Sequence, residues 1–137
     1  VYCHFDGYIS GVGKTLMEHY DSAKANQLVA LGDISILAPT VEVFPGCTHS
    51  WEFPDANITL FYGRDRGEPN TDFRVDYTFE GFLERVYDCG AEYYYVMRDG
   101  QWYAGFASIS PEQHARLSAL PLLVKAKNRR GRREYAE

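Results

Sequence analysis

Residues 2–20 read YCHFDGYISGVGKTLMEHY, which places two histidines, two carboxylates, a lysine and three glycines in nineteen positions. The residues before the first glycine are mostly apolar or aromatic, which predicts a strand over residues 1–5. Glycines at positions 7, 11 and 13 then predict a loop, and apolar residues recur at helical spacing after it. We therefore expect a strand, a glycine loop and a short helix that begins near Lys14 and carries His19 on its last turn.

Polar side chains lie where these elements end. Because side chains alternate along a strand, His4 and Asp6 should share one face. Asp33 follows a second expected helix, residues 22–30, which Asp21 or Ser22 can cap and a glycine can stop.

Two interpretations of these polar residues are open. Histidine and carboxylate side chains can hold a divalent metal or act as acid and base, so His4, Asp6, His19 and Asp33 are candidate site-supporting or metal residues. Alternatively, Asp6 caps the glycine turn and the histidines bind backbone carbonyls. The second interpretation is favoured because no H-x-x-x-H spacing is present.

Gly11 to Thr15, GVGKT, resembles the end of a nucleotide-binding P-loop. A P-loop would need a glycine at position 8, where this chain has Tyr8, so we do not expect a P-loop NTPase. A glycine loop that opens a helix with Lys14 at its start can still attract an anion.

Residues 63–70, GRDRGEPN, are predicted to form a charged loop. Arg64 and Arg66 could form a fork that binds a phosphate or carboxylate, with Asp65 and Glu68 orienting them. Equally, these charges could neutralise one another on a solvated loop. The sequence leaves both open and makes these four residues, with Lys14, the candidate ligand-binding set; no catalytic residue is assigned.

The other expected elements follow from caps, turns and alternation. They are a brief strand at 50–53, a strand at 57–62 with a hairpin partner at 72–77, a helix at 79–87 capped by Thr78, strands at 91–97 and 101–107 joined by Asp99-Gly100, and a helix from Ser110 to about Leu120. Strands joined by hairpins predict an α+β fold, an antiparallel sheet with short helices mainly on one face. We expect one domain over residues 1–124, followed by a basic, flexible tail over 125–137.

The charge divides between these two parts. Residues 1–124 hold eight Lys/Arg and seventeen Asp/Glu, a balance of −9, whereas residues 125–137 have a balance of +4. An acidic body is a poor partner for phosphate backbones. Nucleic-acid contact would therefore rest on the basic side chains of the tail, namely Lys125, Lys127, Arg129, Arg130, Arg132 and Arg133.

Three widely spaced cysteines, Cys3, Cys47 and Cys89, argue against a disulfide framework and fit a reducing cytoplasm. A zinc site from Cys3, His4, Cys47 and His49 would lack the usual paired spacing. No apolar run is long enough to cross a bilayer and no secretion leader is evident, so we expect a cytoplasmic protein without membrane contact.

Several of these motifs recur together elsewhere. In order they are YCHxDGY from Tyr2, Gly13-Lys14, Leu16, His19-Tyr20, LGDIS from Leu31, YGRDRGE from Tyr62, and Asp99-Gly100-x-Trp102-Tyr103. The pattern covers about residues 1–104 and resembles a family of small proteins encoded in bacteriophages, prophages and other mobile regions of bacteria. The resemblance implies an accessory protein in the bacterial cytoplasm. Because its recurring positions are mostly polar, it also favours a single polar site.

Two functions are therefore carried forward. The first is a non-enzymatic phage or prophage accessory protein, with counter-defence as its setting, that holds an anionic nucleotide-like ligand or a host protein. The second is a small hydrolase of phosphate-bearing substrates assisted by a divalent metal. The sequence leaves the ligand, the metal and self-association open.

Overall fold

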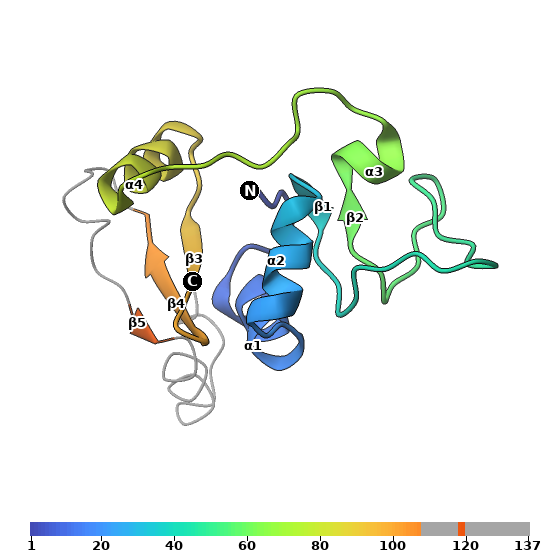
Figure 1. The fold of residues 1–137 in the computed structure, drawn as a ribbon, viewed down its shortest axis with the longest axis horizontal. Coiled ribbons are helices and arrows are strands. Elements are labelled where there is room, and N and C mark those ends of the chain that lie inside the picture. Colours follow the sequence, from blue (N-terminus) through green and yellow to red (C-terminus); the bar gives the residue numbers. More distant parts are fainter. Residues whose placement is uncertain (108–117, 120–137) are drawn as a thin grey trace.

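The computed structural model describes residues 1–107 and 118–119, and Figure 1 shows their arrangement. The elements in chain order are the π-helix η1 (Ile9–Gly13), then α1 (Lys14–His19), α2 (Ser22–Ala30), β1 (Ile34–Ile36), β2 (Leu60–Phe61), α3 (Tyr62–Arg66), α4 (Phe79–Asp88), β3 (Tyr93–Arg98), β4 (Gln101–Phe106) and β5 (Ser118–Ala119). The α+β class is confirmed.

Within the described residues, the antiparallel strands form two small sheets rather than one. β1 pairs with β2, and β3, β4 and β5 form the second sheet in that order. The helix expected from Ser110 falls mostly outside the described residues, and its described part is strand β5. The basic tail lies outside them as well.

The first residues lie beside β1. Ile34 donates its N–H to Tyr2 O at 2.7 Å, and the N–H groups of His4 and Phe5 reach Ile34 O and Ser35 O. The expected strand at 1–5 is thereby reduced to one parallel bridge, Cys3 with Ile34. Asp6 ends this pairing because its φ of 58° lies in the left-handed region.

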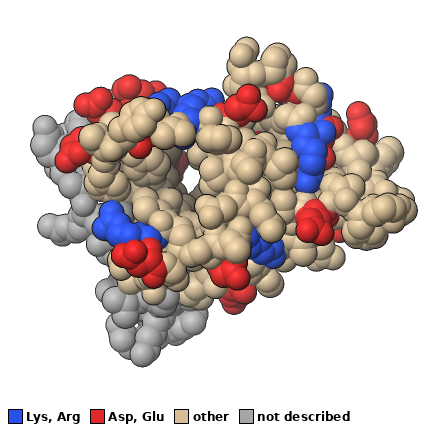
Figure 2. Space-filling view, viewed as in Figure 1, with Lys and Arg blue, Asp and Glu red and all other residues tan. Residues whose placement is uncertain are grey.

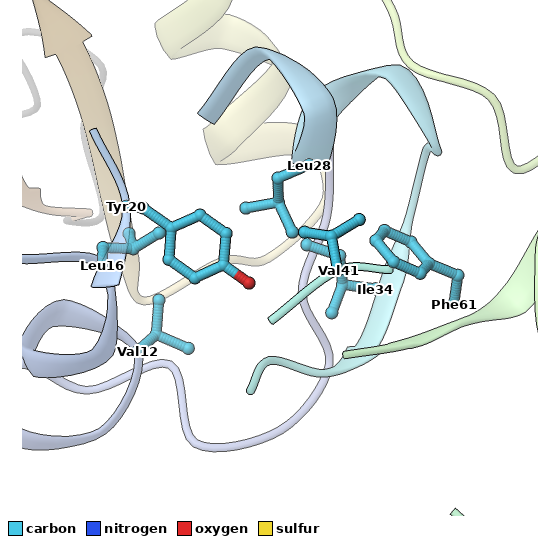
Figure 3. Packing of buried hydrophobic residues seen from close by; sticks show 7 residues of the cluster. All are labelled: Val12, Leu16, Tyr20, Leu28, Ile34, Val41 and Phe61. Carbon is cyan, nitrogen blue, oxygen red and sulfur yellow. The ribbon is translucent and has the colours of Figure 1, made fainter. Parts of the chain in front are cut away.

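The main core lies between α1, α2 and the β1–β2 sheet (Figure 3). Its buried side chains are Val12, Leu16, Tyr20, Leu28, Ile34, Val41 and Phe61. Tyr20 brings its hydroxyl into this core, where it donates to Ala38 O at 2.6 Å. The buried phenol is therefore satisfied, which avoids the cost of an orphaned polar group.

The β3–β4 hairpin attaches to this core through its aromatic side chains. Its turn is Asp99-Gly100 as expected, with both residues at positive φ. Trp102 donates its Nε1–H to Tyr20 O at 2.9 Å, and the Tyr95 hydroxyl donates to Gly7 O. α4 packs on the same hairpin, with Leu83, Val86 and Tyr94 buried between them.

The expected signals at both ends of α2 and at the start of α4 are confirmed. The Asp21 carboxylate accepts the Lys24 N–H at the start of α2, and the Thr78 hydroxyl accepts the Gly81 N–H at the start of α4. Gly32 follows α2 with a φ of +85°. A Cβ at Gly32 would lie 2.2 Å from Thr71 O, so only glycine fits there.

Three other expectations are wrong. Residues 50–53 form a closed turn, in which Ser50 and Phe53 hydrogen-bond to each other. The strand expected at 57–62 is shortened to β2 and pairs with β1 instead of residues 72–77. Residues 72–77, expected to be a strand, form none. They belong to an extended connection, residues 67–78, that crosses from α3 to α4 and is here called the strap (Figure 1).

The charged loop expected at 63–70 begins as a helix. α3 covers its first residues because the Asp65 carboxylate reaches back to the Phe61 N–H at 2.8 Å, as a capping side chain does. Gly67 ends the helix in a left-handed conformation.

Candidate functional site

Asp33 is held by the protein itself. Its side chain is nearly buried, accepts the Tyr2 N–H at 2.9 Å, and receives both terminal nitrogens of Arg74 at 3.2 Å. A bidentate arginine–carboxylate pair of this kind fixes the orientation of the carboxylate. Asp33 therefore anchors the first residues and the strap to the end of α2.

The other expected site-supporting residues lie in separate surroundings. His4 is exposed between the rings of Tyr2 and Phe5, and the Asp6 carboxylate accepts the Tyr8 hydroxyl at 3.1 Å. His19 ends α1 as expected and lines a cavity of about 430 Å³ beside the β3–β4 turn. Across residues 1–107 and 118–119, no group of three or more His, Cys, Asp or Glu side chains is placed to hold a metal ion.

The expected glycine loop is wrong in its second half, because Ile9–Gly13 form the π-helix η1, and the segment uses its backbone donors internally. The N–H groups of Gly11 and Gly13 point to Tyr8 O, and that of Val12 donates to Asp6 O at 2.8 Å. A Cβ at Gly11 would lie 2.4 Å from Asp6 O, so this glycine permits a close backbone contact. Lys14 is exposed at the start of α1, but the amides before it do not form an anion cradle.

Arg64 binds its own chain. Its Nη2 donates to Thr59 O at 2.8 Å, its Nη1 to Val41 O, and its Nε to the Asp65 carboxylate at 2.9 Å. The guanidinium also lies 4.7 Å from the centre of the Phe61 ring. All three of its nitrogens are thus engaged, which makes Arg64 a support that ties α3 to neighbouring segments.

Asp65 is the centre of this support. Besides Arg64, its carboxylate accepts the Phe61 N–H at 2.8 Å and contacts His49 Nε2 at 3.3 Å. Burial alone would raise the pKa of Asp65, but the hydrogen bonds from Arg64, Phe61 and His49 outweigh it and leave that pKa below its usual value. Asp65 is therefore a buried, ionised acceptor.

His49 completes the network and was not singled out by the sequence for this role. Its side chain is fully buried, and its Nδ1 accepts the Asp55 N–H at 2.9 Å. Because Nδ1 accepts this hydrogen bond, Nε2 is the nitrogen that donates to Asp65. This pair fixes the segment around residues 49–55 against α3.

Arg66 is the arginine of this loop that faces solvent. Its side chain is 52% exposed and its guanidinium lies 5.0 Å from the centre of the Trp51 ring, within the range of a cation–π contact. The ring of Trp51 lies 5.4 Å from that of Tyr62. Glu68 Oε1 lies 3.6 Å from Arg66 Nη1, which is too far for a hydrogen bond.

Trp51, Tyr62, Arg66 and Glu68 are here called the Trp51–Arg66 platform. Two of its members belong to the expected ligand-binding set, whereas Trp51 and Tyr62 do not. No spacing rule connects position 51 with position 66. The only feature of the sequence that pointed to Trp51 was its place in a polar, irregular segment. The platform combines two aromatic rings with a partly free guanidinium, which suits an anion that carries a flat ring system.

Comparison of the chain with protein-family models, curated proteins and solved structures finds no match. In the part of the chain that the structure describes, no helix is long and apolar enough to span a bilayer.

Proposed function

We propose that this chain is a non-enzymatic accessory binding protein of a bacteriophage or prophage, acting in the bacterial cytoplasm. It holds an anionic, nucleotide-like ligand on the Trp51–Arg66 platform, and counter-defence is its setting. The phage context rests on the motif resemblance given above. The ligand class rests on the platform.

The observation that carries the proposal is the placement of Arg66. Its guanidinium lies against Trp51, and within the described residues its charged partner is Glu68 at 3.6 Å. Arginine offers five N–H donors in a rigid fork that matches phosphate oxygens. A ligand phosphate can therefore replace the long Glu68 contact without breaking a buried ion pair.

The aromatic pair supplies the second half of the recognition. Stacking of a base on an aromatic side chain contributes about 1–3 kcal/mol. The guanidinium lies 5.0 Å from the centre of the Trp51 ring, so a base stacked on Trp51 stays close to it, with the Tyr62 ring 5.4 Å from that of Trp51. The platform therefore favours a ligand with both a base and a phosphate over inorganic phosphate alone.

The buried network below the platform gives it rigidity. Arg64, Asp65 and His49 join α3 to the segment that carries Trp51, so the rings and the guanidinium are held before a ligand arrives. Preorganisation of this kind reduces the entropy lost on binding. In this account Arg64 and Asp65 support the site, while Arg66 contacts the ligand.

The hydrolase alternative would require its acidic and imidazole groups to converge. His4 and Asp6 lie on the exposed first segment, His19 lies at the end of α1, and Asp33 is committed to Arg74. This separation gives a metal-assisted hydrolase no support.

Calorimetric titration with a panel of mono- and dinucleotides tests the proposal. We expect saturable binding by at least one nucleotide that Arg66→Ala weakens at least tenfold, about 1.4 kcal/mol. Arg98→Ala is the matched control because Arg98 also lies against aromatic rings, those of Phe79 and Tyr103, but on the hairpin. Equal losses in both variants, or no binding by any nucleotide, would refute the ligand class.

A further inference from the structure

The strap has its apolar side chains turned outward. Phe73, Val75 and Tyr77 are 46%, 61% and 96% exposed, whereas the alternating Arg74 and Asp76 are drawn into ion pairs. Alternation with period two is typical of a strand with one buried face. Here the exposed face is the apolar one.

Two ion pairs hold this orientation. Arg74 binds Asp33 through two contacts of 3.2 Å, and Asp76 accepts a 2.8 Å hydrogen bond from Arg85 of α4. A shift of one residue would exchange the two faces and turn the apolar side chains inward. The ion pairs therefore hold the strap in the orientation that leaves its apolar side chains in solvent.

The middle of the strap, residues 72–77, has no backbone pairing with the other described residues. Among the described residues, no backbone N–H or C=O of residues 72–77 takes part in a hydrogen bond, and the flanking pairings are Thr71 O with Asp33 N and Thr78 O with Phe82 N. An extended segment with free backbone groups is a template for another strand. The strap thus offers both backbone partners and an apolar face.

The negative charge around the strap favours a partner segment that carries positive charge. Residues 67–92 hold seven Asp/Glu and two Arg, a balance of −5, and both arginines are paired with carboxylates. Figure 2 shows acidic side chains gathered over α4, where the strap ends. An approaching segment gains from Lys or Arg side chains.

A second copy of the chain fits this surface poorly. Two straps would bring the same acidic segments together, and like charges oppose each other. Phe73, Val75 and Tyr77 together expose roughly 400 Å², whereas a stable interface buries about 800 Å² per partner. An area of this size suits a short, extended peptide segment.

We propose that residues 72–77 are a strand-addition site that binds an extended segment of a partner protein in which apolar residues alternate with Lys or Arg. The added strand pairs with the strap backbone and places its apolar side chains beside Val75 and Tyr77. This site uses none of the residues of the Trp51–Arg66 platform, so either proposal can fail alone.

Fluorescence anisotropy with the full chain tests the site. The probe is a labelled peptide of about eight residues that alternates valine with lysine, compared with one that has glutamate for lysine and one with N-methylated backbone amides. We expect the lysine peptide to bind at least tenfold more tightly than either. Equal affinity for the glutamate peptide overturns the charge argument, and equal affinity for the N-methylated peptide overturns strand addition.

Two variants locate the peptide. Tyr77→Ala should weaken binding about tenfold, while Phe53→Ala, at a ring that is 79% exposed elsewhere, should leave it unchanged. Arg66→Ala should also leave it unchanged, which separates this site from the nucleotide site. Loss in all three variants would overturn the assignment to the strap.

Hydrogen exchange identifies the occupant. The amides of residues 72–77 should exchange rapidly in the free protein and become protected when the lysine peptide is added. Protection without peptide that disappears on dilution would mean that a second copy covers the strap. Protection that persists on dilution would mean that the chain covers it itself, and either result overturns the proposal.

Discussion

The buried ring of His49 donates its Nε2–H to the carboxylate of Asp65, at 3.3 Å. The two lie sixteen positions apart in the sequence, and the contact fixes an irregular segment against helix α3. Trp51 lies two residues after His49 and Arg66 directly follows Asp65. The pair therefore sets the distance between the ring and the guanidinium of the platform.

Replacing Asp65 should destabilise the protein markedly. Asp65→Asn removes the charge that faces Arg64 and leaves buried donors of Arg64, Phe61 and His49 poorly matched. We expect a loss of about 2–3 kcal/mol in the free energy of unfolding. Urea denaturation measures this loss, with Glu68→Gln as the control. Because Glu68 is exposed, that substitution should lower the free energy of unfolding by less than about 0.5 kcal/mol. Equal stability of the two variants would contradict the role given to Asp65.

The same carboxylate should give stability a pH dependence. The pKa of Asp65 is lower in the folded protein than in the unfolded chain, because the hydrogen bonds it accepts outweigh its burial. Its contribution is complete above the unfolded pKa of about 3.9 and is lost as the pH falls through the lower folded value. The stability difference between wild type and Asp65→Asn should therefore shrink below about pH 4. A difference that stays constant or grows on acidification would contradict this.

Gly32 should tolerate substitution less well than other glycines at positive φ. Gly32→Ala adds a Cβ that would lie 2.2 Å from Thr71 O, at a φ of +85°. The left-handed conformation alone costs about 1–2 kcal/mol, and the clash adds to it. Gly90→Ala is the matched control, with a φ of +74° and no atom within 4 Å of the added Cβ. Thermal unfolding should show the larger loss for Gly32→Ala.

The cysteines should differ in reactivity. Burial raises the pKa of the Cys3 thiol to about 12, so little thiolate forms there at neutral pH. Cys89 is exposed after α4. Mass spectrometry after brief iodoacetamide treatment should find Cys89 alkylated in the native protein, and Cys3 only after unfolding. Equal labelling of both would contradict the packing of Cys3 against the core.

Local signals were enough to predict the helix caps and one hairpin. Asp21 and Thr78 cap their helices through hydrogen bonds to residues three positions away, and Asp99-Gly100 makes its turn within four residues. These features need no knowledge of the tertiary fold. The α+β class was predicted from two hairpins, of which the structure contains the one at β3–β4.

The strap shows why other elements could not be predicted. Residues 72–77 alternate as a strand should, but Arg74 binds Asp33, 41 residues earlier, and this pair turns the apolar face outward. Likewise, the sequence marked Arg64 and Arg66 equally. Only the carbonyls of Val41 and Thr59, brought near by folding, distinguish the partly buried Arg64 from the exposed Arg66.

Native mass spectrometry of the full chain, purified gently from bacteria, shows whether the Trp51–Arg66 platform holds a nucleotide. We expect a retained ligand with the mass of a nucleotide or related phosphate ester, which is lost in Arg66→Ala and kept in Arg98→Ala. A protein that carries no such ligand under these conditions and takes up none from a nucleotide mixture would contradict it.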